Sequence, residues 1–265
     1  MKVAIIQYST YGHITTMARA VQQGVLESGL ASSADLFQVP ETLPQDVLEL
    51  IHAPEKPDDI PEATVSVFKD YDSFLFGIPT RFGNLPAQWV DFWGKTGELW
   101  TQGSLHGKPA AIFVSTGTPG GGQEATVKNA LTYLAHHGMP YISLGYTPVF
   151  PEMTNLDEIH GGSAWGAGTY AGADGSKQPS ELETRVARIQ GNEFAKAAIK
   201  FMKNESSQSP QKDITKTRGH QKPTDTPVNQ TNNGEKKSVV KETREKQSTK
   251  TTKPDEKSGC KCIIV

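Results

Sequence analysis

Short apolar runs alternate along the chain with longer segments in which apolar residues recur at helical spacing. Residues 2–8 (KVAIIQY) are short, apolar and β-branched, which is typical of a buried parallel strand. The next segment, from Ile14 to about Ser28, repeats apolar residues on one helical face, and Gly29 predicts its end. Similar units follow as far as residue 202. This alternation predicts a parallel sheet with helices on both faces.

The same two periodicities predict the remaining elements. Further strands are expected at residues 34–39, 73–78, 110–115 and 141–144. Further helices are expected at residues 43–51, 85–93, 124–136 and 180–202. Five strands without a second βαβ half favour an α/β, flavodoxin-like three-layer sandwich with a five-stranded parallel sheet over a dinucleotide-binding Rossmann domain.

Residues 145–179 are rich in glycine and show neither periodicity. A structureless segment of this length is unusual inside a compact domain. We therefore expect it to be held in place by oligomer contacts or by a ligand.

Composition divides the chain at about residue 204. Every Phe, Tyr and Trp lies in residues 1–204, whereas residues 205–265 hold 13 Lys/Arg, 8 Asp/Glu and many small polar residues. Such a segment cannot bury enough apolar surface to offset the entropy lost on ordering. We expect one packed domain at 1–204 and a disordered basic tail at 205–265. The remaining 14 Lys/Arg and 21 Asp/Glu make the domain acidic, which argues against nucleic acid as a partner.

The two cysteines, Cys260 and Cys262, both lie next to the C-terminus. The domain therefore offers no disulfide scaffold, zinc–thiolate site or cysteine nucleophile, and no metal site is expected. Residues 262–265 (CIIV) match a C-a-a-X box, which predicts prenylation of Cys262 and acylation of Cys260, unless the match is a chance tetrapeptide. No apolar run is long enough for a transmembrane helix, and no signal peptide is evident. We expect a cytoplasmic protein attached peripherally to a membrane through its C-terminus.

Three loops follow the carboxyl ends of three predicted strands, where open α/β sheets bind their ligands. We name them loop 1 (residues 9–14), loop 2 (residues 79–84) and loop 3 (residues 115–123). Loop 1 is rich in hydroxyl groups and leads into a helix, so it predicts an anion site. Because it lacks G-x-x-x-x-G-K, a phosphate monoester such as that of FMN fits better than a nucleoside triphosphate. An ordinary capped turn is the alternative.

Loops 2 and 3 supply groups that suit a flat ring. Loop 2 carries Arg81, Phe82 and Asn84, which are a cation, an aromatic ring and an amide, although Arg81 alone also fits a surface ion pair. Loop 3 has three adjacent glycines, which allow the backbone to approach a ligand closely or form a flexible turn. All three loops meeting at one edge favours a ligand site.

The loops and several other segments resemble those of the WrbA-type NAD(P)H:quinone oxidoreductases, which are FMN enzymes of flavodoxin-like fold. The matching segments are YSTYGHI (8–14), FGIPTRFGN (76–84), TGELW (96–100), STGTPGGGQE (115–124), LAHHGM (134–139), HGGSAWGAGTYAG (160–172) and DGSKQPS (174–180). The resemblance spans nearly all of residues 1–202. The long polar tail is similar to that of fungal members.

The resemblance implies a role for each loop residue. The FMN-phosphate contacts fall on Ser9, Thr10, Tyr11, Gly12, His13 and Ile14. The contacts to the flavin ring fall on Thr80, Arg81 and Phe82, with Gly83 and Asn84 beside them, and on Ser115, Thr116, Gly117, Thr118, Pro119 and Gly120. Pro119 resembles an extra residue before the glycines, so this last alignment is open by one position.

Outside the three loops, the resemblance implies that His136 approaches the flavin and acts in catalysis. It also implies that Tyr11, Phe82 and Trp100 bind the substrates. These are NADH or NADPH as the electron donor and a quinone as the acceptor, used in turn at one site. A homotetramer in which neighbouring chains complete each site is implied as well.

The function expected is FMN-dependent reduction of quinones in detoxification or defence against oxidative stress. Two alternatives remain. The first is a lipid-anchored flavin-binding membrane-domain or signalling protein with little turnover, because fold alone does not decide function. The second is a one-electron carrier.

Overall fold

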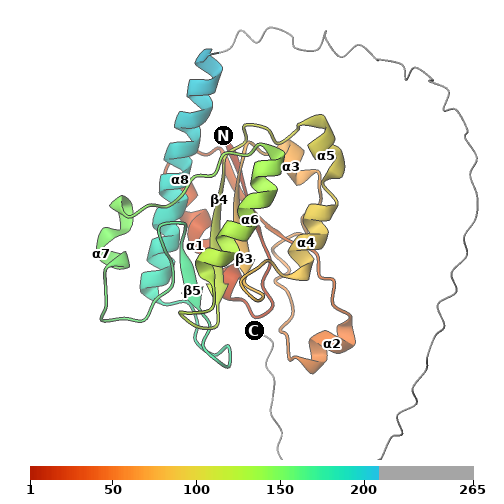
Figure 1. The fold of residues 1–265 in the computed structure, drawn as a ribbon, viewed down its shortest axis with the longest axis vertical. Coiled ribbons are helices and arrows are strands. Elements are labelled where there is room, and N and C mark those ends of the chain that lie inside the picture. Colours follow the sequence, from red (N-terminus) through yellow and green to blue (C-terminus); the bar gives the residue numbers. More distant parts are fainter. Residues whose placement is uncertain (209–265) are drawn as a thin grey trace, which may run out of the picture. The chain divides into compact units, whose positions relative to one another are not determined.

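Five parallel strands form the centre of the computed structural model, which describes residues 1–208 (Figure 1). The strands are β1 (Lys2–Gln7), β2 (Ser33–Gln38), β3 (Ser73–Pro79), β4 (Ala110–Thr116) and β5 (Gly168–Tyr170). They pair in the order β2-β1-β3-β4-β5, and every pairing is parallel. The predicted α/β sandwich with a five-stranded parallel sheet is therefore confirmed.

Alternate residues of the strands face two separate cores. In β1, Val3 and Ile5 belong to one core, whereas Ala4 and Ile6 belong to the other. Because successive side chains point to opposite faces, a sheet covered on both sides needs apolar residues at consecutive positions. This explains the uninterrupted apolar runs from which the sequence predicted the strands.

The helices divide between the two faces (Figure 1). One face is covered by α1 (His13–Glu27) and α8 (Glu181–Gln208), and the other by α3 (Val67–Asp70), α4 (Ala87–Gly94), α5 (Gly97–Gln102) and α6 (Gln123–His137). The short helix α2 (Gln45–Leu50) buries none of its residues.

Two glycines bring α1 and α8 into close contact. A Cβ atom on Gly24 would lie 1.8 Å from the carbonyl oxygen of Arg188, and one on Gly191 would lie 2.1 Å from that of Val21. Real Cβ atoms cannot occupy such space, so the two helices cross at a separation that glycine alone permits. The crossing fixes the helix that begins at loop 1.

The fifth strand is not at residues 141–144, and that prediction is wrong. Tyr141 forms a single bridge with Ala110 at the amino end of β4. The carboxyl half of β4 pairs instead with β5. Glycine allows this close approach, because a Cβ atom on Gly166 would lie 2.0 Å from the carbonyl oxygen of Ile112.

Hydrogen bonds within the chain hold the Gly-rich segment, and the oligomer contacts or ligand expected from its sequence stay a prediction. It contains a short 3-10 helix, η1 (Thr147–Val149), the helix α7 (Phe150–Met153) and β5. The fully buried carboxylate of Glu183 in α8 organises its second half. Glu183 accepts hydrogen bonds from the backbone N–H groups of Gly161, Tyr170 and Ser180, from the Thr169 hydroxyl and from Lys177 Nζ.

Some of the sequence predictions lie outside the described residues. They include nearly all of the tail predicted at 205–265 and the two lipidation candidates, Cys260 and Cys262. Within residues 1–208, no helix combines the length and the apolar character needed to cross a bilayer.

Candidate functional site

Loop 1 connects β1 to α1 through a left-handed glycine. Gly12 has φ +88° and precedes the first residue of α1, His13. Ser9 and Thr10 are buried, and Ser9 Oγ accepts a hydrogen bond from the N–H of Ile14 at 3.2 Å. The hydroxyl-rich turn predicted from the sequence is therefore an ordered turn that leads into a 15-residue helix. The N-terminal end of this helix carries partial positive charge.

The backbone of loop 1 has unused donors. The N–H groups of Thr10, Tyr11, Gly12 and His13 donate to no acceptor among the described residues. Donors at a helix N-terminus suit an anion. The ring of His13 is buried, which lowers its pKa, and its Nε2 donates to the carbonyl oxygen of Lys177 at 3.0 Å. The imidazole thus joins loop 1 to the Gly-rich segment.

Loop 2 is a tight turn with an exposed ring at its tip. Arg81 and Asn84 exchange backbone hydrogen bonds of 2.8 and 2.9 Å, while Phe82 and Gly83 adopt φ +54° and +73°. A positive φ is unfavourable for an aromatic residue. The Phe82 side chain is fully exposed. Strain and an exposed apolar ring occur at the same residue, which makes Phe82 a candidate ligand contact.

Loop 3 turns from β4 into α6 by means of glycine. Thr116 Oγ1 and the N–H of Gly121 both donate to the carbonyl oxygen of Thr118, and Gly122, with φ +90°, precedes α6. Ser115 and Thr116 are buried, whereas the backbone beyond them reaches solvent. The exposed or half-buried residues of this loop are Gly117, Thr118, Pro119, Gly120, Gly121 and Gly122.

Hydrogen bonds join the three loops into one edge. Arg81 Nη2 donates to Thr10 Oγ1 at 3.1 Å, which links loop 2 to loop 1. The N–H of Thr80 donates to the carbonyl oxygen of Ser115 at 2.9 Å, which links loop 2 to loop 3. The Thr80 hydroxyl also contacts that of Thr126 in α6 at 2.7 Å. The structure therefore brings the three predicted loops together at one edge of the sheet.

Arg81 carries the charge of this edge. Among the described residues, no carboxylate forms an ion pair with its guanidinium, which donates instead to the carbonyl oxygen of Thr80 and to Thr10. Burial lowers the pKa of Arg81 from its ordinary value, but a guanidinium stays protonated. The surface ion pair considered for Arg81 is thus absent from this part of the chain.

His136 and Trp100 lie at the end of the described domain opposite the three loops. His136 is in the last turn of α6, about 20 Å along that helix from loop 3 at 1.5 Å per residue. Trp100, which is 58% exposed, is in α5, and Thr96 at the start of α5 contacts Nε2 of His137 at 2.9 Å. In Figure 1, α5 and the end of α6 lie at the top, opposite the carboxyl ends of the strands. A single chain does not bring these two residues to its loops.

Sequence reasoning missed a polar cluster beneath loop 1. Glu41 accepts hydrogen bonds from the Tyr8 hydroxyl and from Gln88, and it forms an ion pair with Lys56 at 3.3 Å. The position of Glu41 could have revealed it, because Glu41 follows the carboxyl end of β2 at the same edge of the sheet as the three loops. Nothing comparable distinguished Lys56.

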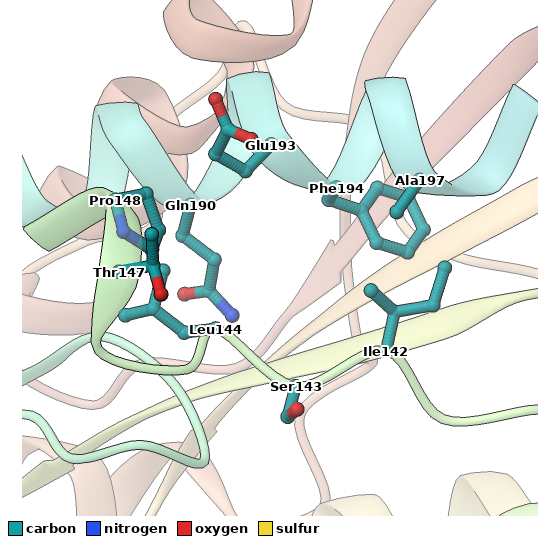
Figure 2. Close-up of a pocket in the computed structure, with 9 residues that line it drawn as sticks. All are labelled: Ile142, Ser143, Leu144, Thr147, Pro148, Gln190, Glu193, Phe194 and Ala197. Atoms are coloured by element: carbon teal, nitrogen blue, oxygen red, sulfur yellow. The ribbon is translucent and has the colours of Figure 1, made fainter. Parts of the chain in front are cut away.

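A separate hollow of about 430 Å³ lies between α8 and residues 142–148 (Figure 2). Ile142, Leu144 and Phe194 supply apolar walls, and Gln190 and Glu193 supply polar groups. No residue of the three loops lines it, so it is not part of the candidate site.

Comparison with known proteins agrees with this arrangement. The flavodoxin family matches residues 5–138, which include all three loops. The NAD(P)H quinone oxidoreductase YCP4 of Candida albicans is 61% identical over 203 residues, which cover 77% of this chain and 70% of that protein. The Protoplast secreted protein 2 of Saccharomyces cerevisiae is 55% identical over 200 residues, which cover 76% of this chain and 99% of that protein.

A solved structure supports the fold. The flavodoxin, WrbA-like protein from Agrobacterium tumefaciens superposes with a TM-score of 0.52 at 19% identity, covering 76% of this chain and 98% of that one.

The sheet order and the three joined loops define an α/β protein of the flavodoxin type. The chain belongs to the flavodoxin family, among relatives that include fungal NAD(P)H quinone oxidoreductases, and this confirms the resemblance seen in its motifs.

Proposed function

We propose that this protein is an FMN-dependent NAD(P)H quinone oxidoreductase. One observation carries the proposal: hydrogen bonds join three loops at one edge of the sheet, and one of these loops carries Arg81, a cation without a carboxylate partner among the described residues. Relatives named as NAD(P)H quinone oxidoreductases, at 61% and 54% identity, support the same activity.

The residues present fit the two ends of FMN. Loop 1 offers unused N–H donors, the Ser9 hydroxyl and a helix N-terminus, which suit a phosphate monoester. Loops 2 and 3 offer the exposed ring of Phe82 and solvent-facing glycine backbone, which suit a flat heteroaromatic ring. Arg81 of loop 2 donates a hydrogen bond to Thr10 and so connects the two parts of the site.

Bound FMN would supply the redox chemistry, which is hydride acceptance from NAD(P)H and two-electron transfer to a quinone. The protein's contribution is placement and charge. Arg81 keeps positive charge at the edge of the site and so stabilises an anion held there. Tyr11 and Phe82 offer aromatic surface to the nicotinamide and the quinone.

We infer that His136 and Trp100 serve a neighbouring subunit of a homotetramer. A catalytic group must lie within hydrogen-bond reach of the atom that it protonates. The length of α6 separates His136 from the loops of its own chain by about 20 Å. Supplied by a neighbour, His136 would relay a proton to the quinol, and Trp100 would cover the substrate.

The cellular role that we propose is quinone detoxification at a membrane surface. Reduction by two electrons removes a quinone without releasing a one-electron radical. The C-a-a-X box at Cys262, the neighbouring Cys260 and the basic tail supply two lipid signals and an attraction to anionic lipid, which together give stable peripheral attachment.

The test is the visible spectrum of the full chain loaded with FMN, recorded without oxygen. Adding NADPH or NADH should bleach the flavin band, and adding p-benzoquinone should restore it. FMN that binds but is not bleached by either nucleotide would contradict the proposal and support the flavin-binding membrane-domain or signalling protein.

A further inference from the structure

Lys56 lies outside the three loops but contacts the first of them. It belongs to the connector after α2, and its Nζ donates to the carbonyl oxygen of Ser9 at 2.6 Å. The side chain is only 22% exposed, and Nζ lies 4.7 Å from the centre of the Tyr8 ring. A lysine in this setting gives up most of its hydration for a few fixed contacts.

Glu41 keeps the Lys56 ammonium in place. Burial alone would raise the pKa of Glu41, but hydrogen bonds from the N–H groups of Leu43 and Thr42, from Tyr8 and from Gln88 hold that pKa below its ordinary value. Glu41 therefore remains ionised beside Lys56. Burial lowers the pKa of Lys56, and the charge of Glu41 opposes that effect.

The contact with Ser9 sets the direction of the next peptide N–H. In a planar trans peptide, the carbonyl oxygen of one residue and the N–H of the next point in opposite directions. Because Lys56 holds the carbonyl oxygen of Ser9, the N–H of Thr10 points away from Lys56. That N–H is one of the loop 1 donors without an acceptor among the described residues.

The polar residues around Lys56 also carry a net positive charge next to loop 1. A chain of contacts leads from Lys56 through Glu41, Tyr8 and Thr10 to Arg81. It contains two cations and one carboxylate, so it favours an anion at loop 1.

We propose that Lys56 is a positioning residue for the phosphate of the flavin nucleotide. It fixes the Ser9–Thr10 peptide so that loop 1 presents its N–H donors, and it adds positive charge beneath them. This inference rests on the proposed function. It assigns to Lys56 the preference for a phosphorylated flavin over one that lacks the phosphate.

The experiment compares the dissociation constants of FMN and riboflavin for the full chain, freed of flavin. Lys56→Met should weaken FMN binding by about tenfold or more, since a hydrogen bond from a charged group is lost. Riboflavin binding should change by less than about threefold, because riboflavin has no phosphate. Lys56→Arg keeps a charged donor and should restore most of the FMN preference.

Lys108→Met is the matched control. Lys108 is also a partly buried lysine whose pKa burial lowers, and its Nζ donates to the carbonyl oxygens of Phe68 and Tyr71, remote from loop 1. Lys108→Met should leave the ratio of the riboflavin to the FMN dissociation constant unchanged. If Lys56→Met does not fold, Lys56→Gln provides the same comparison.

The inference would be overturned if the folded Lys56 variant kept the wild-type ratio of the riboflavin to the FMN dissociation constant. It would also be overturned if this ratio fell equally in Lys108→Met. A wild-type chain that binds neither flavin would instead contradict the proposed function.

Discussion

Arg81 donates a hydrogen bond to the Oγ1 atom of Thr10, which lies 71 residues earlier in the chain. A second bond, from Nη1 to the carbonyl oxygen of Thr80, measures 2.8 Å. Both acceptors are neutral, so they orient the guanidinium without cancelling its charge. A cation that is already oriented binds an anion with little further loss of entropy.

Replacing Arg81 with alanine should weaken FMN binding by about tenfold or more, because a hydrogen bond to a charged group contributes about 1.5–3 kcal/mol. Flavin fluorescence titration measures the change. Arg19→Ala is the control, since Arg19 forms an exposed ion pair with Asp59. Equal affinities for the two variants would show that Arg81 has no part in the site.

Glu183→Gln should lower the free energy of unfolding by about 3 kcal/mol at pH 7, because it removes the charge of a fully buried carboxylate that pairs with the partly exposed Lys177 and accepts several hydrogen bonds. Burial would raise the pKa of Glu183, but Lys177 and the hydrogen-bond donors hold it below the ordinary value of 4.5. The stabilisation is therefore present above pH 4.5 and is lost as the pH falls through the lower, folded pKa.

Urea unfolding at several pH values tests this. The difference between wild type and Glu183→Gln should shrink as the solution becomes more acidic. Glu181→Gln, in the same first turn but exposed, should show almost no difference. A difference for Glu183→Gln that is independent of pH would contradict the ionised, hydrogen-bonded state.

His136→Ala and Arg81→Ala chains should complement each other. If His136 acts in a neighbour's site, a mixed tetramer contains some sites with intact loops and an intact histidine from another chain. Refolding the two variants together should give more quinone reduction than either variant refolded alone. No gain, in mixtures shown to contain both chains, would place His136 outside the catalytic site.

Gly24→Ala should destabilise the fold by about 3 kcal/mol, because its Cβ would collide with the backbone of α8. The matched change is Gly94→Ala in α4, where a Cβ meets nothing within 4 Å. That variant should be unaffected or slightly more stable, since alanine favours helix. Thermal unfolding of the two variants provides the comparison, and similar melting temperatures would show that the α1–α8 crossing adjusts.

Cys262→Ser should move the protein from the membrane fraction to the cytosol, because it removes the proposed prenylation site. Cys260→Ser should leave a weaker, reversible attachment, since a single lipid chain binds marginally. Cell fractionation measures both, and flavin binding should survive in each. A Cys262→Ser protein that stays at the membrane would point to attachment by a protein partner.

The sequence was sufficient to locate the loops, because their signals are local. Apolar runs end at Gln7, Pro79 and Thr116, and glycines or hydroxyl residues follow each. Parallel strands place their carboxyl ends at one edge, so the meeting of the loops followed from the strand order. The bonds between them, such as Arg81 to Thr10, depend on side-chain geometry that spacing does not specify.

The position of the fifth strand and the burial of Glu183 depend on long-range packing, which the local sequence pattern does not reveal. Residues 141–144 are more strand-like than Gly168–Tyr170, yet the latter occupy the edge of β4 because glycine permits close backbone approach. Glu183 looks like an exposed residue in the first turn of a helix, and it is buried only because the Gly-rich segment folds over it.

The crossing of α1 and α8 also bears on how the protein is made. Loop 1 is among the first parts of the chain to be synthesised, but the helix behind it is held by α8, the last element of the described domain. Contacts between segments so far apart in sequence cost more loop-closure entropy and are slower to form than local ones. A nascent chain that lacks α8 therefore has its loops but no rigid support for them. We therefore expect flavin to bind only after α8 has been synthesised.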